Sequence, residues 1–113
     1  MQLDLQSRPF PLTAALKHAV RTQLARLQAR FGDWLHYARV RLEDVNGPRG
    51  GVDKRCRMVF GLPQMQPVVV QARSEDMYHA INQASRRAEQ ALDHELKRRR
   101  LPAPTPPMAE PAD

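Results

Sequence analysis

Arginine is the residue type whose abundance points most directly to chemistry in this sequence. Of the 18 Lys and Arg residues, 15 are Arg, and with 12 Asp and Glu residues the formal net charge is +6. A guanidinium group is planar and presents a fork of N–H donors that matches two oxygens of one phosphate. We therefore expect a polyanionic partner, either nucleic acid or an anionic membrane surface. A basic domain without such a partner is the alternative.

Many of these bases recur at helical spacing in two segments. In residues 13–31 the bases flank an apolar stripe, two on each shoulder: Lys17, Arg21, Arg26 and Arg30. In residues 74–99 one row holds Arg87, His94 and Arg98, and a neighbouring row holds Arg86, Gln90 and Lys97. Glu89 and Asp93 share one edge of this helix, and its broad opposite side is basic. The rows favour contact with a polyanion; an ordinary solvated helix face is the alternative.

A second basic patch is predicted on strands. Its members point away from the predicted core, on the sheet face that the helices leave open: Arg39, Arg41, Arg55 and Arg57. Because like charges on neighbouring strands repel, this patch requires Glu43 or an external anion to offset it. Aromatic residues make up 5% of the chain, too few for a surface that stacks bases. Phosphate and shape recognition of folded RNA is therefore the better fit.

Other reactive residue types lack the spacing that catalysis or metal binding requires. Cys56 is the one cysteine, and its predicted place on an apolar strand face indicates a buried, inert thiol. The histidines lie on separate elements without ligand spacing: His18, His36, His79 and His94. The loop at residues 47–51 is not followed by the Lys-Ser/Thr pair of a phosphate-binding loop. We expect no enzyme activity, metal, cofactor or small-molecule substrate.

The prolines divide the chain into two parts. Five of the ten fall in residues 101–113, which we predict to be a disordered tail. Residues 1–100 then form one domain with a net charge of +8, from 18 bases and ten acids. The N-terminus has neither the charged region nor the long apolar run of a signal peptide, and no segment approaches the ~20 apolar residues of a membrane span. We expect a cytoplasmic protein.

Hydrophobic periodicity predicts the elements that position the bases. Alternating apolar residues indicate strands at 2–6, 36–45, 54–62 and 67–73. Apolar residues three and four apart indicate helices at 13–31 and 74–99. The expected inward-facing side chains on the helices are Leu16, Val20, Leu24, Leu27, Phe31, Met77, Ile81, Ala84, Ala88 and Leu92.

The ends of the helices have their own signals. Thr13 is the expected N-cap of the first helix, and Ser74 or Asp76 that of the second. Gly32 is expected to take the left-handed conformation that ends the first helix. The element order is β-α-β-β-β-α. We therefore predict an α+β fold whose four-stranded sheet carries both helices on one face and leaves the other exposed.

Three segments resemble the ribosome hibernation-promoting factors, also known as ribosome-associated inhibitors or sigma-54 modulation proteins. They are the Thr-x-x-Leu helix over Thr13–Phe31, the sequence Asp-Met-Tyr-His-Ala-Ile at Asp76–Ile81, and the stretch Asp44–Cys56, which is typical of a short-form branch. The resemblance covers about residues 1–100. It implies a fold similar to the double-stranded-RNA-binding domain.

The resemblance also implies a function. Family members bind the small ribosomal subunit where mRNA and tRNAs would lie, and they silence translation while ribosomes are stored in stress and stationary phase. Their helix surfaces meet ribosomal RNA. Basic positions of the family match Lys17, Arg26, Arg87, His94 and Arg98; Gln23 and Gln90 stand where relatives often have bases, and Ser85 replaces an apolar residue.

Two other functions stay open at this point. One is a protein-interaction module that modulates transcription through the arginines of the open sheet face. The other is a general binder of double-stranded RNA. The sequence also leaves open whether the protein promotes ribosome dimers or only silences single ribosomes, because a proline-rich tail stands where long-form relatives carry a second domain.

Overall fold

A computed structural model describes residues 1–45 and 53–98 of the chain. Its elements are β1 (Gln2–Arg8), α1 (Ala14–Phe31), the short 3-10 helix η1 (Gly32–Trp34), β2 (Tyr37–Asp44), β3 (Lys54–Gly61), β4 (Val68–Ser74) and α2 (Met77–Arg98). The order β-α-β-β-β-α confirms the prediction. The expected loop at residues 47–51, the end of the second helix at Arg99 and the proline-rich tail lie outside the described residues.

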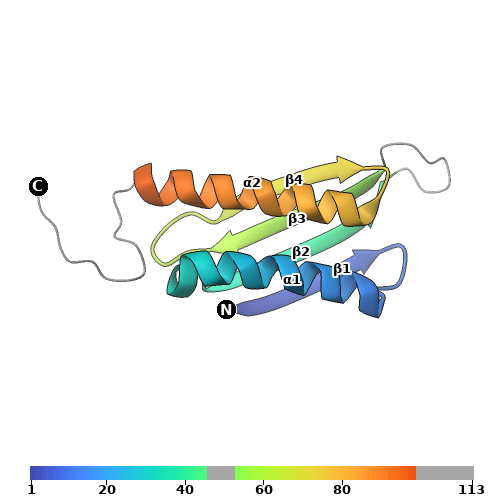
Figure 1. Ribbon diagram of the computed structural model, residues 1–113, viewed down its shortest axis with the longest axis horizontal. Helices are drawn as coiled ribbons and strands as arrows, with labels where there is room; N and C mark the ends of the chain where they lie inside the picture. Colours follow the sequence, from blue (N-terminus) through green and yellow to red (C-terminus); the bar gives the residue numbers. More distant parts are fainter. Residues whose placement is uncertain (46–52, 99–113) are drawn as a thin grey trace, which may run out of the picture.

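The four strands form one sheet in the order β1-β2-β3-β4. β1 pairs with β2 in parallel, and the two later pairings are antiparallel. A parallel pair needs a crossover connection, which α1 supplies between β1 and β2. Both helices lie side by side on one face of the sheet and run in the same direction (Figure 1). The other face is open, as predicted.

α1 begins and ends at residues with recognisable roles. The Thr13 hydroxyl accepts the N–H of Leu16 at 3.1 Å and so caps the helix, as predicted. Gly32 follows the helix with φ 57° and ψ −131°. Its φ is positive, as expected, but its ψ lies outside the left-handed helical region, so that detail of the prediction was wrong. The reason is local: the chain continues into η1 instead of leaving the helix directly.

α2 begins after two polar residues that act in sequence. The Asp76 carboxylate accepts the N–H of Tyr78 at 3.1 Å, and the Ser74 hydroxyl accepts the N–H of Asp76 at 3.2 Å. Asp76 is therefore the residue that caps the helix, whereas Ser74 positions Asp76. The ten side chains predicted to face inward from the two helices are all buried.

The core lies between the helices and the two central strands. Ala38, Val40 and Leu42 from β2 alternate with exposed arginines, and each is no more than 2% exposed. Cys56, Met58 and Phe60 occupy the matching positions of β3 and are 0% exposed. On the edge strands, Ala72 and Val68 of β4 are also buried, whereas Leu3, Leu5 and Val70 pack only partly against the core, because an edge strand has a neighbour on one side alone.

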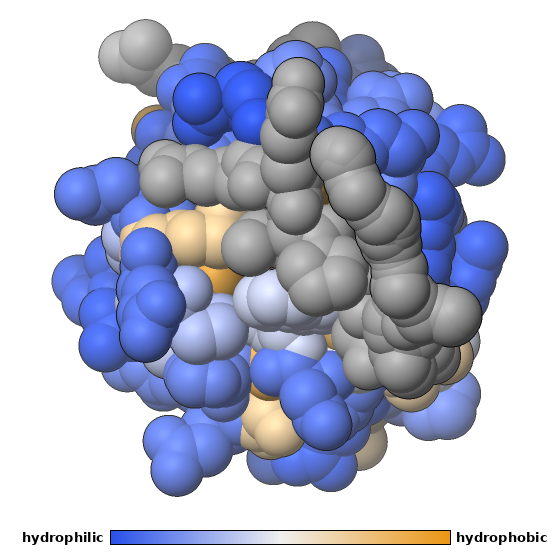
Figure 2. Space-filling model, turned by 90° about the vertical axis from the view of Figure 1, so that its left-hand side faces the viewer, coloured by the Kyte–Doolittle hydropathy of each residue, from blue (hydrophilic) through white to orange (hydrophobic). Residues whose placement is uncertain are grey.

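The described surface is mostly polar. Seen along the long axis from the left-hand side of Figure 1, it is mainly hydrophilic, and apolar side chains show only in small areas (Figure 2). In the part of the chain that the structure describes, neither helix is long and apolar enough to cross a membrane.

Candidate nucleic-acid interface

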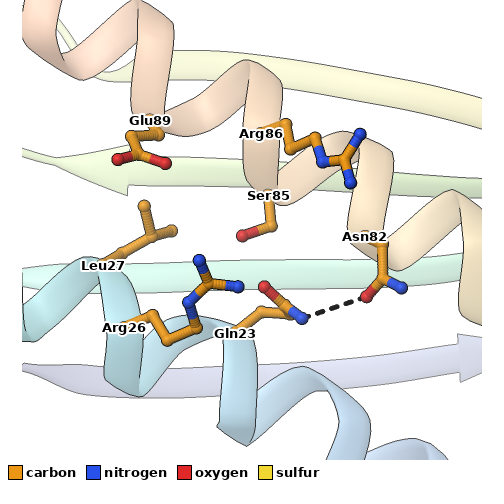
Figure 3. Close-up of a pocket in the computed structure, with 7 residues that line it drawn as sticks. All are labelled: Gln23, Arg26, Leu27, Asn82, Ser85, Arg86 and Glu89. Atoms are coloured by element: carbon orange, nitrogen blue, oxygen red, sulfur yellow. Dashed lines mark hydrogen bonds between the residues drawn. The ribbon is translucent and has the colours of Figure 1, made fainter.

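A polar groove of about 310 Å³ separates the two helices. Its lining residues are Gln23, Arg26 and Leu27 from α1, and Asn82, Ser85, Arg86 and Glu89 from α2 (Figure 3). The Gln23 side-chain amide donates to the Asn82 side-chain oxygen at 3.0 Å and bridges the groove. We call these seven residues the inter-helix groove.

The small residues of α2 allow the helices to lie this close. Ala84 and Ala88 are fully buried, and Ser85 is 6% exposed with its hydroxyl directed toward α1 in Figure 3. Because the two helices run in the same direction, residues 59 positions apart face each other at both the Gln23–Asn82 and the Arg30–Glu89 contacts. Six of the seven side chains that line the groove are polar or charged, and Leu27 is the apolar one.

Two arginines face this groove without a carboxylate partner among the described residues. Arg26 projects from α1 and Arg86 from α2 (Figure 3). Within residues 1–45 and 53–98, no carboxylate lies within 4 Å of either guanidinium group. Both guanidinium groups can therefore bind an external anion, and an RNA phosphate matches their planar N–H forks.

Arg30 has a different environment from the one expected. It forms ion pairs with Glu89 and with Asp93, the latter at 3.0 Å, and Lys97 contacts the same Asp93 at 3.3 Å. The acidic edge of α2 thus faces α1, where one arginine bridges two carboxylates. Helical spacing alone could not show this, because it places residues around one helix and says nothing about the neighbouring helix. Arg30 and Lys97 are partly neutralised as a result.

The remaining bases of α2 lie on its other flank, beside β4. Arg87 donates to the backbone oxygen of Gln71 at 2.6 Å and so ties the helix to the edge strand. His94 and Arg98 line a second hollow against β4, and Arg98 pairs with Glu95 at 2.7 Å. The predicted row Arg87, His94 and Arg98 is therefore a separate surface from the inter-helix groove.

Lys17 and Arg21 lie on the flank of α1 that faces away from α2. At ~100° per residue, they are roughly 120° and 160° around the helix from Gln23, which contacts α2. The nine predicted RNA contacts are consequently spread over three surfaces: the inter-helix groove and its ion-paired end, the β4 flank of α2 and the outer flank of α1.

The open sheet face holds the second predicted basic patch, and the strand register orders it into rows. Arg41 stands opposite Arg57, and Glu43 stands opposite Arg55. The Arg55 Nε donates to the Glu43 carboxylate at 2.8 Å. This hydrogen bond, with the nearby charges of Arg41 and Arg8, lowers the pKa of Glu43 below its usual value despite some desolvation.

The sequence interpretation missed two members of this open face. Parallel pairing places Arg8 of β1 opposite Glu43, and antiparallel pairing places Arg73 of β4 opposite Arg55. Arg8 was missed because β1 was predicted to end at residue 6. Arg39 differs from the others, since its guanidinium carbon lies 5.1 Å from the centre of the Tyr37 ring.

Two aspartates hold the ammonium group of Lys54 at the start of β3. Asp53, which is 1% exposed, and Asp44 both accept from the ammonium of Lys54, at 3.1 and 3.2 Å. The two hydrogen bonds raise the pKa of Lys54.

Burial raises the pKa of the Cys56 thiol to about 12, which suits the inert thiol that the sequence predicted. In the described part of the chain, no three His, Cys, Asp or Glu side chains converge to hold a metal ion.

The chain was compared with known proteins and structures. A search of curated proteins by sequence finds no match. A ribosomal subunit interface protein from Coxiella burnetii has a TM-score of 0.71 and 20% identity, with 84% of this chain and 98% of that chain covered; at this identity it supports the fold alone. The Protein Y N-terminal domain from Thermus thermophilus has a TM-score of 0.68 and 29% identity, with 87% and 98% covered.

The family comparison covers most of the sequence. Residues 3–100 match the family described as "Sigma 54 modulation protein / S30EA ribosomal protein". The matched range contains every described helix and nearly all of the sheet. The chain therefore belongs to this family of ribosome-associated factors.

Proposed function

We propose that the protein is a translation inhibitor of the hibernation type, which binds ribosomal RNA of the small subunit and occupies the mRNA/tRNA channel. The mechanism is steric. Arginine and lysine side chains neutralise phosphates and release their counterions, and the bound domain fills space that mRNA and tRNA require. This mechanism needs no catalysis. A protein that binds ribosomes in this way acts in the cytoplasm.

The inter-helix groove carries this proposal. Arg26 and Arg86 lie in it, and no carboxylate of residues 1–45 or 53–98 pairs with either; residues 1–100 have a net charge of +8. Polar groups between the arginines, from Gln23, Asn82 and Ser85, can accompany phosphate binding with hydrogen bonds to sugar and phosphate oxygens. Family membership supports the ribosome as the source of the RNA, and the Coxiella burnetii protein of the same fold is described as a ribosomal subunit interface protein.

Cosedimentation with separated ribosomal subunits tests the partner. We expect the protein to pellet with the small subunit at low salt and to be released as salt is raised. With roughly six phosphate contacts, the logarithm of the affinity should fall with the logarithm of salt concentration at a slope of about −4 to −5. Absence from the small-subunit pellet at low salt would overturn the proposal.

A pair of double variants tests the surface. R26Q/R86Q removes two charges from the inter-helix groove, whereas K17Q/R21Q removes the same charge from the outer flank of α1. If the groove is the main contact, R26Q/R86Q should lose about ten-fold or more in affinity and reduce the salt slope by about 1.4 to 1.8, and both effects should exceed those of K17Q/R21Q. Equal losses would show a bulk charge effect and contradict the assignment to the groove.

The two other functions are outcomes of the same measurements. Binding to a free RNA duplex as tight as binding to the small subunit would indicate a general double-stranded RNA binder. A protein partner captured through the open sheet face, and retained after nuclease treatment, would indicate an interaction module that acts on transcription.

A further inference from the structure

We propose that the basic end of the open sheet face binds an RNA phosphate backbone, so that RNA contacts the domain from both sides of the sheet. The open-face patch consists of Arg8, Arg41, Glu43, Arg55, Arg57 and Arg73. The inference rests on the proposed function insofar as the ribosome supplies the RNA. It adds a second surface, separate from the inter-helix groove.

Strand register builds the patch in two adjacent rows. One row runs Arg8, Glu43, Arg55 and Arg73 across all four strands. The next row places Arg41 beside Arg57, with a glutamine outside each of them. The rows are two residues apart along each strand, a rise of about 7 Å, so the five guanidinium groups share one compact area.

The positive charge of the patch exceeds its internal compensation. Five arginines face one carboxylate, and Glu43 is engaged by Arg55. Arg41 and Arg57 stand directly opposite each other, and within the described residues no carboxylate lies within 4 Å of either. Like charges directly opposite each other destabilise a sheet. An anion bound between them would offset this cost.

RNA fits the patch better than an acidic protein does. Protein interfaces centre on apolar and aromatic anchors in desolvated pockets. On this face the large apolar and aromatic side chains lie outside the two arginine rows: Val59 and Val69 stand in the next row beside Arg39, and Tyr37 lies one row further on. The patch itself is arginine flanked by glutamine. Five guanidinium forks on a strand surface match a backbone of repeated phosphates.

The position of the patch determines what kind of RNA it can use. The sheet lies between the patch and the inter-helix groove, since both helices cover the opposite face (Figure 1). The two surfaces therefore require two separate RNA segments, or two parts of one folded molecule. Folded ribosomal RNA provides such an arrangement.

Salt-dependent binding of R41Q/R57Q tests the patch, with both small subunits and a labelled RNA duplex as probes. We expect the salt slope for small subunits to shrink by about 1.4 to 1.8, the share of two phosphates. The ratio of wild-type to variant affinity should then change about nine-fold between ~50 and ~200 mM salt. R41K/R57K is the matched control; it keeps the charge and should keep most of the slope.

The outcomes separate this inference from the proposed function. An unchanged slope and affinity of R41Q/R57Q on small subunits, which the wild-type protein binds, would overturn the patch and leave the proposed function standing. If the wild-type protein does not bind small subunits, the duplex decides: loss of duplex binding in R41Q/R57Q supports the patch, and equal binding by variant and wild type overturns it. If the wild-type protein binds neither the small subunits nor the RNA duplex, both proposals are overturned.

A crosslinking probe tests which molecule touches the face. Gln71 stands opposite Arg57 on β4 and is exposed, so Q71C accepts a photoreactive maleimide, whereas the buried Cys56 does not. N82C carries the same probe into the inter-helix groove. On the ribosome we expect crosslinks to RNA from both positions, at different RNA segments. Crosslinks from Q71C to protein alone, or none while N82C gives them, would overturn the inference.

Discussion

The guanidinium group of Arg30 on α1 lies 3.0 Å from the carboxylate of Asp93 on α2, and the same guanidinium group pairs with Glu89. This bridge ties the C-terminal end of α1 to the C-terminal half of α2, which runs parallel to it. It also places two carboxylates at one end of the inter-helix groove, where they reduce the positive field available to a phosphate. In the binding mode proposed above, these two carboxylates limit where along the helices an RNA backbone can lie.

Replacing Glu89 should strengthen RNA binding. E89Q removes a negative charge from the groove wall, while Arg30 keeps Asp93 as a partner. We expect affinity for small subunits to rise several-fold at low salt, with a slope steeper by up to about one. Since Arg30 and Glu89 are both about half exposed, the free energy of unfolding should change by only about 0–1 kcal/mol.

E75Q is the control for this change, because Glu75 is an exposed carboxylate that precedes α2. It should alter small-subunit binding less than E89Q does. Weaker binding of E89Q would show that the carboxylate supports the RNA-binding geometry, contrary to the expectation.

Acid should destabilise the protein in part through Glu43. The hydrogen bond from Arg55 holds the pKa of Glu43 below 4.5 in the folded state. A lowered pKa gives stability that is present above pH ~4.5 and is lost as pH falls through the folded-state value. E43Q should therefore unfold with a weaker pH dependence below pH ~4.5 in urea titrations, and should cost about 0.5–1.5 kcal/mol at neutral pH. The same pH dependence of the free energy of unfolding in E43Q and in the wild-type protein below pH ~4.5 would contradict this role.

The Cys56 thiol should resist alkylation in the folded protein. Its pKa of about 12, against an ordinary 9.0, lowers the thiolate fraction at pH ~8 by about a thousand-fold. Reaction with iodoacetamide should accordingly be slow in buffer and fast in urea, as mass spectrometry can measure. Rapid labelling without denaturant would show that β3 opens far more readily than its buried position indicates.

Gly61 is the partner of Tyr37 across the sheet, and a methyl group there would overlap the tyrosine ring. G61A should therefore cost about 1–3 kcal/mol in the free energy of unfolding. In the Y37A background the same change should cost little, because the space is empty; the double-mutant cycle gives the coupling between them. Equal costs in the two backgrounds would mean that the ring moves aside freely.

The sequence predicted the elements well because each depends on neighbours along the chain. The stripe from Leu16 to Phe31 and the alternation through Val40 and Met58 are local patterns, and each side chain is buried as expected. The errors lie at the ends of elements. β1 runs to Arg8 instead of residue 6, and the backbone of Gly32 differs from the expected conformation because η1 follows it.

The candidate site was predictable in residue type but less so in arrangement. Arg26 and Arg86 were both named as RNA contacts, yet nothing in a single sequence shows that they share one groove across 60 positions of chain. Arg87 was also predicted to contact RNA, and the structure adds that its guanidinium group donates to the backbone oxygen of Gln71. That contact depends on the position of α2 over the edge strand, which no local pattern encodes.

The amino-acid sequence was enough to predict the faces on which the bases lie, the order of the elements and the resemblance to a ribosome-associated family. Which bases are neutralised depends on how the helices and strands pack. Their packing pairs Arg30 with two carboxylates of α2 and Glu43 with Arg55, and it leaves Arg41 and Arg57 opposite each other. Periodicity in the sequence reports which side of one helix or strand is buried. The partner of a charged side chain depends on the distance to another element, and that distance is fixed only when the elements pack together.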